Sequence, residues 1–257
     1  MESFDESIKA EFPDHNTPTD IELGLDTMHR LKVSVCDGIE LSPVSKVPAQ
    51  MMIFTQVALR RTVELAEAAI REMNRRNLVT SALLARGTIE TSCLLWDVMF
   101  RVEEVANSGD TKRLAEIHEL MSKSLLGGKA KDFRLSEEIE ARNVITIIER
   151  LTKKLDAPLM AYFERLSEFA HPNYHGMMAT YTVEGGDARK EFCEGRIGTR
   201  RPLILTALGT LATSISIVVR SFEMMAKDLE KLAILAEREI HESGRWPAAE
   251  PYPVQRG

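Results

Sequence analysis

The stretch Pro202–Val219 reads PLILTALGTLATSISIVV and holds no charged residue, with an arginine on either side of it. A membrane-spanning helix needs about 20 mostly apolar residues. This run is slightly short and carries several threonine and serine hydroxyls, so we expect it to be buried inside the protein and not to span a membrane. A helix that is apolar nearly all round is typical of the centre of a bundle. The stretch therefore predicts an all-α protein built around a helix over residues 202–241.

Apolar residues recur with a helical period through most of the remaining chain. In one such segment, Val144, Ile148 and Leu151 fall on a single face. The expected helices cover residues 21–35, opened by Asp20 as N-cap, then 49–74, 78–106, 111–125, 136–155, opened by Ser136, and 158–171. They predict a single helical bundle over residues 49–243. Residues 1–48 are expected to form a loose N-terminal arm, the short helix and a linker.

A small β-hairpin is expected as an insertion near residues 177–194. Met177–Val183 is rich in residues that favour strands, Glu184–Asp187 has the composition of a turn, and Lys190–Cys193 can return as a second strand. Residues 244–257 contain prolines and show no apolar period, which predicts a disordered tail.

Composition and charge set limits on the class of protein. The chain has 257 residues, of which 44% are hydrophobic and 28% charged, as is ordinary for a soluble globular protein. The net charge of -6 argues against a chain-wide electrostatic grip on nucleic acid, although a local basic patch stays open. The cysteines form no CxxC pair, and the acidic N-terminus lacks an apolar signal region. We expect a cytoplasmic protein without a cofactor.

Polar chemistry is densest in Tyr162–Gly176, which reads YFERLSEFAHPNYHG. The residue before a proline avoids the helical conformation, so Pro172 is expected to end the helix near His171. Arginine and histidine together can stabilise developing negative charge and move protons near neutral pH. The candidate catalytic residues of this stretch are Arg165, Glu168 and His171, and the candidate binding residues are Asn173, Tyr174 and His175.

Two other chemistries compete for the same stretch. Glu168 and His171 form a Glu-x-x-His sequence of the kind that binds metal in di-iron bundles, but the chain offers no second copy. Ser167 and His171 could touch across one helical turn, but no oxyanion-stabilising device accompanies them. We therefore expect neither a metal site nor a serine nucleophile.

A second candidate group lies on the helix expected over residues 78–106. Arg86, Glu90, Asp97 and Arg101 are spaced along one stripe, so that Arg86 can pair with Glu90 and Asp97 with Arg101. Glu90 lies between apolar neighbours, where an unpaired carboxylate would be costly to bury. Two interpretations stay open: a surface ion pair, or a half-buried carboxylate that orients another group. Arg86 and Glu90 are both candidate binding residues.

The segment Arg165-Leu-Ser-Glu-Phe-Ala-His171 resembles the Arg-x(4–6)-His signature of HEPN domains. RGTIET at Arg86–Thr91, together with the later LSEFAHPNYHG, is also similar to HEPN-related helical proteins of bacteria. The resemblance covers residues 50–242 approximately. The Arg-x(4–6)-His signature implies a helical bundle, a metal-independent ribonuclease that acts on RNA as a homodimer, and a role in stress response or phage defence. The similarity to HEPN-related bacterial proteins implies the fold and no activity.

The alternative hypothesis is a non-catalytic helical interaction module. Here His171 would cap the helix C-terminus, where a cation or donor is favoured, and Asn173 would shape the turn that follows. Glu168 or Glu90 would then pair with Arg165 or with a histidine. In this interpretation the HPNYH segment is a structural motif at a helix end.

Overall fold

The computed structural model describes residues 1–12, 17–128, 132, 139–185, 189–193 and 201–244. Within those residues it contains ten α-helices, one 3-10 helix and a two-stranded antiparallel sheet. The predicted all-α class with a small β-hairpin is therefore confirmed.

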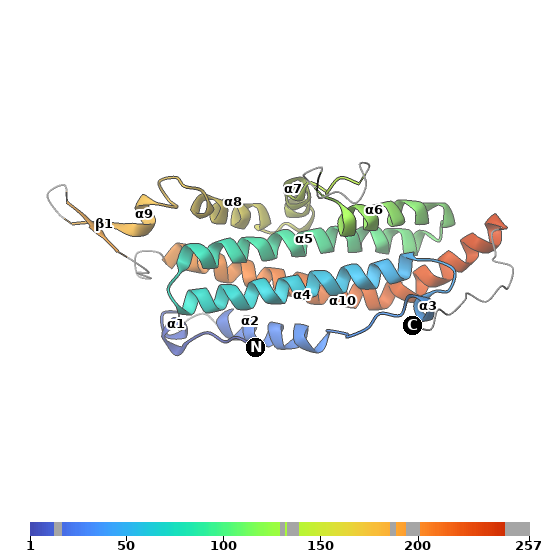
Figure 1. Cartoon of the computed structure of the whole chain (residues 1–257), viewed down its shortest axis with the longest axis horizontal. Coiled ribbons are helices and arrows are strands. Elements are labelled where there is room, and N and C mark those ends of the chain that lie inside the picture. Colours follow the sequence, from blue (N-terminus) through green and yellow to red (C-terminus); the bar gives the residue numbers. More distant parts are fainter. Residues whose placement is uncertain (13–16, 129–131, 133–138, 186–188, 194–200, 245–257) are drawn as a thin grey trace. The chain divides into compact units, whose positions relative to one another are not determined.

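The long helices match the predicted segments closely, and most differences fall at the short elements (Figure 1). The helices are α1 Glu6–Ala10, α2 Thr17–Arg30, α3 Gly38–Leu41, α4 Val47–Asn74, α5 Leu78–Ser108, the 3-10 helix η1 Thr111–Arg113, α6 Leu114–Leu126, α7 Val144–Leu155, α8 Leu159–Ala170, α9 Met178–Tyr181 and α10 Arg201–Ser243. The strands are β1 Thr182–Glu184 and β2 Lys190–Phe192.

Contacts divide the chain into two compact units, and α4, α5 and α10 each contribute a segment to both. Unit 1 comprises Met1–Val33, Thr55–Asp97 and Arg142–Glu223, and unit 2 comprises Ser34–Phe54, Val98–Ala141 and Met224–Gly257. Each unit is made of three separate segments of the chain. The units therefore describe how the helices pack, and they cannot be compared with the predicted boundaries near residues 48 and 243.

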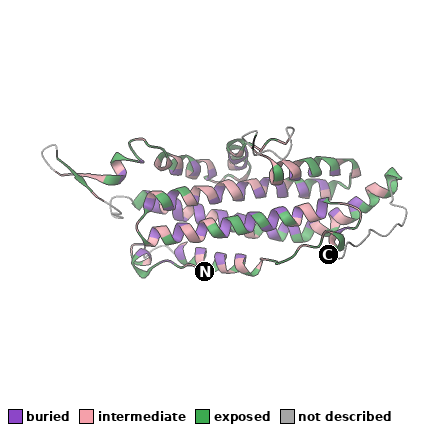
Figure 2. Cartoon of the chain, in the orientation of Figure 1, coloured by how far each residue is buried: buried purple, intermediate pink, exposed green. Residues whose placement is uncertain are grey.

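The apolar half of α10 lies in the core of unit 1. Leu208, Leu211 and Val218 are almost fully buried, and Figure 2 shows the buried residues gathered along this helix. The polar residues of this segment are accommodated by hydrogen bonds. Thr210 donates to the backbone carbonyl of Thr206 at 2.7 Å, and the Ser214 hydroxyl lies 3.1 Å from that of Thr88 in α5. The threonines and serines therefore do not prevent burial.

Two of the described helices, α5 and α10, are long and apolar enough to cross a membrane by length and composition alone. Within the protein, 50% of the most apolar window of α5 and 61% of that of α10 are buried. The central helices of soluble proteins have the same property, so the two windows do not decide where the protein is located.

Small residues let the other helices of unit 1 approach closely. A Cβ atom on Gly24 of α2 would lie 2.4 Å from Cγ2 of Ile215 in α10, so glycine is required at that contact. A Cβ atom on Gly209 of α10 would lie 2.9 Å from the hydroxyl oxygen of Tyr162 in α8. The helices α2 and α8 are therefore each in contact with α10.

Unit 2 is held together by apolar residues and by polar contacts at its surface. Its buried side chains include Val102 and Val105 of α5, Ile117 of α6, and Leu232 and Leu235 of α10. At the surface, the amine of Lys231 donates to the Asn107 side chain at 2.9 Å, and Nδ1 of His118 in α6 lies 2.9 Å from the Gln50 side chain in α4. The polar contacts join segments that are far apart in sequence.

The N-terminus differs from the predicted loose arm. Ile8 of the short helix α1 is buried, and so are Phe4 before it and Phe12 after it. The following helix begins at Thr17, so Asp20 lies in its first turn and is not the predicted N-cap. Burial of the aromatic side chains supplies the stabilisation that a loose arm would lack.

The helix predicted from Ser136 begins later. Residues 133–138 lie outside the described part of the chain, residues 139–143 are not helical, and α7 begins at Val144. Asn143 is its N-cap, because the side chain accepts a hydrogen bond from the Ile145 backbone N–H at 3.0 Å. Asn143, and not Ser136, therefore sets the start of α7.

The hairpin is present but shorter than predicted. Residues 178–181, expected to be strand, form the one-turn helix α9. The strands pair antiparallel, with Thr182 opposite Phe192 and Val183 opposite Glu191. Most of the connector before α10 and nearly all of the predicted tail, residues 194–200 and 245–257, lie outside the described residues.

Candidate functional site

The helix α8 ends where Pro172 predicted. His171 has extended backbone angles, φ -86° and ψ 148°, and its N–H donates to the Ser167 carbonyl at 3.1 Å. A proline cannot follow a residue in the helical conformation without a steric clash, so the last helical residue is Ala170. The histidine is therefore placed at the boundary between the helix and the next loop.

The loop after His171 folds back on the end of the helix. Asn173 donates from its side-chain amide to Glu168 at 2.8 Å, and its side-chain oxygen accepts the Gly176 N–H at 2.9 Å. Gly176 packs so closely that a Cβ atom there would lie 2.0 Å from the His171 carbonyl oxygen. Asn173 thus shapes the turn, and Glu168 takes part in it.

Arg165 lies on an exposed part of α8 and does not pair with either predicted carboxylate. Its guanidinium donates to the Thr206 hydroxyl of α10 at 3.4 Å. Glu168 is engaged by Asn173, and Glu90 is engaged by Arg86. The predicted pairing of Glu168 or Glu90 with Arg165 or a histidine is therefore wrong.

The side chain of His171 is exposed at the helix end, and within the described part of the chain it has no polar partner. The backbone carbonyl of the same residue accepts the Asn173 N–H at 2.8 Å. The described side chains make no hydrogen-bonded network that joins Arg165, Glu168 and His171, although all three lie near the C-terminus of α8 or at its cap.

Arg86 and Glu90 of α5 form a half-buried ion pair with a nitrogen–oxygen distance of 3.0 Å. The guanidinium of Arg86 also lies over the ring of Phe163, 4.6 Å from its centroid. Because Phe163 belongs to α8, this cation–π contact joins α5 to the helix that carries Arg165 and Glu168. The group that Glu90 orients is therefore Arg86.

Aromatic and methionine side chains gather after α8. The ring of His175 lies 5.5 Å from that of Tyr174 and 5.9 Å from that of Phe169, measured between centroids. Exposed large apolar side chains continue from there into α9 and the hairpin, and we call them the aromatic–methionine surface: Tyr174, Met177, Met178, Tyr181 and Phe192. Of these, only Tyr174 was among the predicted binding residues. Met177, Met178 and Tyr181 follow Tyr174 at i+3, i+4 and i+7, which is a helical spacing, but residues 177–183 are also rich in residues that favour strands and were expected to form one.

A buried ion cluster was also missed. Asp97 of α5 accepts hydrogen bonds from Arg142 and Arg150, and is not joined to Arg101 as predicted. The described residues contain no group of three or more histidine, cysteine or acidic side chains placed to hold a metal ion.

Comparison with protein-family models, with curated proteins and with solved structures finds no match to this chain.

Proposed function

We propose that the protein is a non-catalytic helical interaction module, which binds a partner protein through the aromatic–methionine surface. The observation that carries the proposal is the exposure of this surface: Phe192 is 87% and Tyr174 66% exposed. Large apolar side chains gathered on a surface mark interaction sites, and aromatic residues and methionine are enriched at protein interfaces.

The hairpin supports the same proposal. Its two strands have three residues each, and every residue of β2 is exposed. An isolated two-stranded hairpin is marginally stable in water, and three or more strands or packing against another element are needed for independent stability. A partner that covers Phe192 would supply such packing.

The loop geometry favours a structural role for the HPNYH segment. The carboxylate of Glu168 and both ends of the Asn173 amide are used inside the loop, and Arg165 is held by Thr206. A general acid or base must instead be free to reach the substrate. Glu168, Asn173 and Arg165 therefore each take part in a structural hydrogen bond.

Capture experiments test the proposal. The full chain is compared with the variant Tyr174→Ser, Met178→Ser, Phe192→Ser and with a control variant that changes exposed apolar residues elsewhere, Val57→Ser, Leu83→Ser, Ile234→Ser. We expect the wild type and the control variant to retain a protein from cell lysate that the surface variant does not retain. Retention of the same proteins by all three chains would overturn the proposal.

Metal-independent cleavage of RNA is a second candidate, favoured by one observation. The exposed His171 side chain, which has no polar partner among the described residues, could move a proton. Arg165 on the same helix could stabilise negative charge on a phosphate. In this candidate the chain acts as a homodimer in the cytoplasm in stress or phage defence, as the HEPN resemblance implies.

The nuclease candidate is tested by Arg165→Ala and His171→Ala, with Glu164→Ala as a control at an exposed position of the same helix. RNA cleavage and cell toxicity are measured after circular dichroism has verified the fold. A nuclease should lose activity in the first two variants only. Unchanged cleavage and toxicity in all of them would exclude this chemistry.

A further inference from the structure

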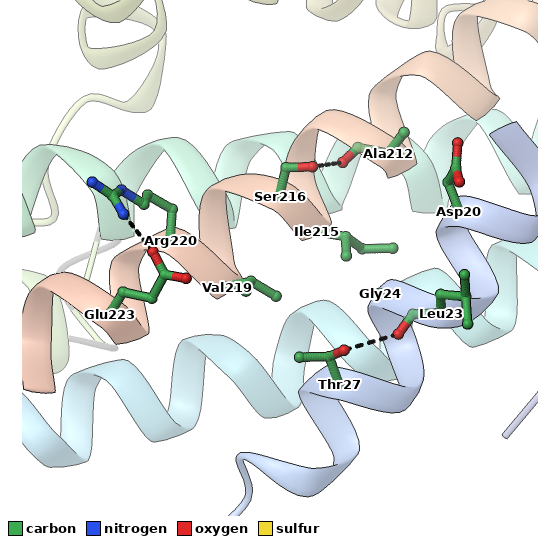
Figure 3. A pocket seen from close by; sticks show the side chains of 10 residues that line it. All are labelled: Asp20, Leu23, Gly24, Thr27, Ala212, Ile215, Ser216, Val219, Arg220 and Glu223. Atoms are coloured by element: carbon green, nitrogen blue, oxygen red, sulfur yellow. Dashed lines mark hydrogen bonds and ion pairs between the residues drawn. The ribbon is translucent and has the colours of Figure 1, made fainter.

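A hollow of about 400 Å³ runs between α2 and α10 in unit 1 (Figure 3). Ile215 of α10 is 3% exposed and lies in its floor, whereas Leu23 of α2 is 63% exposed and stands at its edge. The two helices meet at Gly24, whose backbone lies so close to Ile215 that a Cβ atom would stand 2.4 Å from its Cγ2. The hollow is therefore an open groove beside a projecting leucine.

The two hydroxyl groups that line the groove form hydrogen bonds within their own helices. The Thr27 hydroxyl donates to the Leu23 carbonyl at 3.0 Å, and the Ser216 hydroxyl donates to the Ala212 carbonyl at 2.9 Å. Both hydroxyls are thus bonded to their own helix, as Figure 3 shows. The lining behaves as an apolar surface, which gains free energy when another apolar group covers it.

Opposite charges lie at the two ends of the groove. Asp20 is exposed at the end near Ala212, and no partner for its carboxylate is found among the described residues. Arg220 lies at the other end, exposed, and pairs with Glu223 one turn along α10. A two-fold rotation would bring the projecting leucine of one copy to the groove of the other, and Asp20 of one copy to Arg220 of the other. The surface is therefore complementary to itself.

We propose that this groove is a self-association surface and that its occupant is a second copy of the chain. Leu23 of each copy enters the groove of the other and packs against the half-buried Ala212 and Val219 of its lining. Asp20 of each copy pairs with the partner's Arg220. The proposal does not rest on the interaction module proposed above, whereas the nuclease candidate also assumes a homodimer. A dimer of this kind would carry two aromatic–methionine surfaces.

Glu223 gives the proposal a distinctive prediction. Its carboxylate already pairs with Arg220, so it competes with the incoming Asp20 and adds a like charge beside it. Removal of that charge by Glu223→Gln should therefore strengthen the dimer. A variant that merely damaged the fold would weaken it.

Sedimentation equilibrium of the full chain across a range of concentrations tests the proposal. The variants are Leu23→Ser, Asp20→Arg, Arg220→Asp, the double variant Asp20→Arg with Arg220→Asp, and Glu223→Gln. Glu64→Arg is the matched control, because Glu64 is an exposed helical carboxylate of unit 1 that does not line the groove. Circular dichroism verifies the fold of each variant.

We expect a wild-type dimer whose dissociation constant rises roughly tenfold or more in each of the first three variants, a change of about 1.4 kcal/mol per factor of ten. The double variant should recover most of the loss, because it restores the charge pair with exchanged signs. Glu223→Gln should lower the constant and Glu64→Arg should leave it unchanged. A monomeric wild type would overturn the proposal, as would a dimer indifferent to Leu23→Ser or a double variant without recovery.

Discussion

The carboxylate of Asp97 in α5 accepts a hydrogen bond from the guanidinium of Arg142, which precedes α7. Arg150 of α7 donates to the other oxygen of the same carboxylate. Asp97 is 3% exposed, so its charge is removed from water and depends on the two arginines. The cluster attaches α7 and the segment before it to α5.

We expect Asp97→Asn to destabilise the protein strongly, by about 3 kcal/mol, because the largely buried guanidinium of Arg142 would lose its counter-charge. Asp26→Asn is the control, since Asp26 pairs with Arg30 at the surface and such pairs contribute about 0–1 kcal/mol. Urea unfolding measures both. Equal losses of stability in the two variants would contradict the role given to the buried cluster.

Gly176→Ala should disrupt the loop after α8. The added methyl would lie 2.0 Å from the His171 carbonyl oxygen, so the loop must move away from the helix end. Overpacking of this kind costs about 1–3 kcal/mol. Hydrogen exchange should show faster exchange of the Gly176 and Met177 amides. Tyr174→Ala, which removes an exposed ring, should leave these amides protected.

Stability should fall on acidification partly through Glu67. Partial burial acts to raise the pKa of Glu67, but the hydrogen bond from His29, the Glu2 N–H and the nearby positive charges outweigh it and lower the pKa. Nε2 of His29 donates to the Glu67 carboxylate at 2.8 Å.

A lowered carboxyl pKa contributes stability above the unfolded-state value of about 4.3, and this contribution is lost as pH falls through the folded-state value. The variant Glu67→Gln should therefore reduce the stability difference between pH 7 and pH 3, measured by urea unfolding at each pH. Glu64→Gln, at an exposed position, should retain the wild-type difference. An unchanged difference in Glu67→Gln would contradict this account.

Cys93 should be inert in the folded protein. Burial is the main cause that raises the pKa of its thiol to about 12, and the Asp97 charge adds to it against a smaller opposing hydrogen bond from Ser92. The thiolate is the reactive form, so alkylation at pH 8 should modify Cys93 only after unfolding. Mass spectrometry with and without urea measures this, and Cys36, which is partly exposed, should react earlier.

The sequence predicts the long helices well because the apolar residues that stabilise them form a pattern along the chain. An apolar period marks the buried face of α4 and α5, a run that is apolar nearly all round marks the first half of α10, and Pro172 marks the end of α8. Short elements depend on local capping instead. Both Ser136 and Asn143 are residues that favour the N-cap position, and an apolar period alone does not distinguish between them, whereas the structure has Asn143 as the N-cap of α7.

The candidate site was only partly predictable, for a different reason. Helical spacing suggests partners one turn away, and it correctly pairs Arg86 with Glu90. It fails for Asp97, whose partners come from a distant segment that spacing cannot bring near. The loop bonds of Asn173 could have been anticipated, because asparagine commonly bonds a backbone N–H shortly after it in a turn.

The burial of Pro202–Val219 also bears on how the chain can fold during its synthesis. The helices α2, α5 and α8 contact this run through Gly24, Thr88 and Tyr162, and all three precede it in the chain. A ribosome makes proteins from the N-terminus, and earlier segments can begin to fold first. The uncharged apolar run thus leaves the ribosome after the helices that pack against it. This order shortens the time during which the exposed run could aggregate.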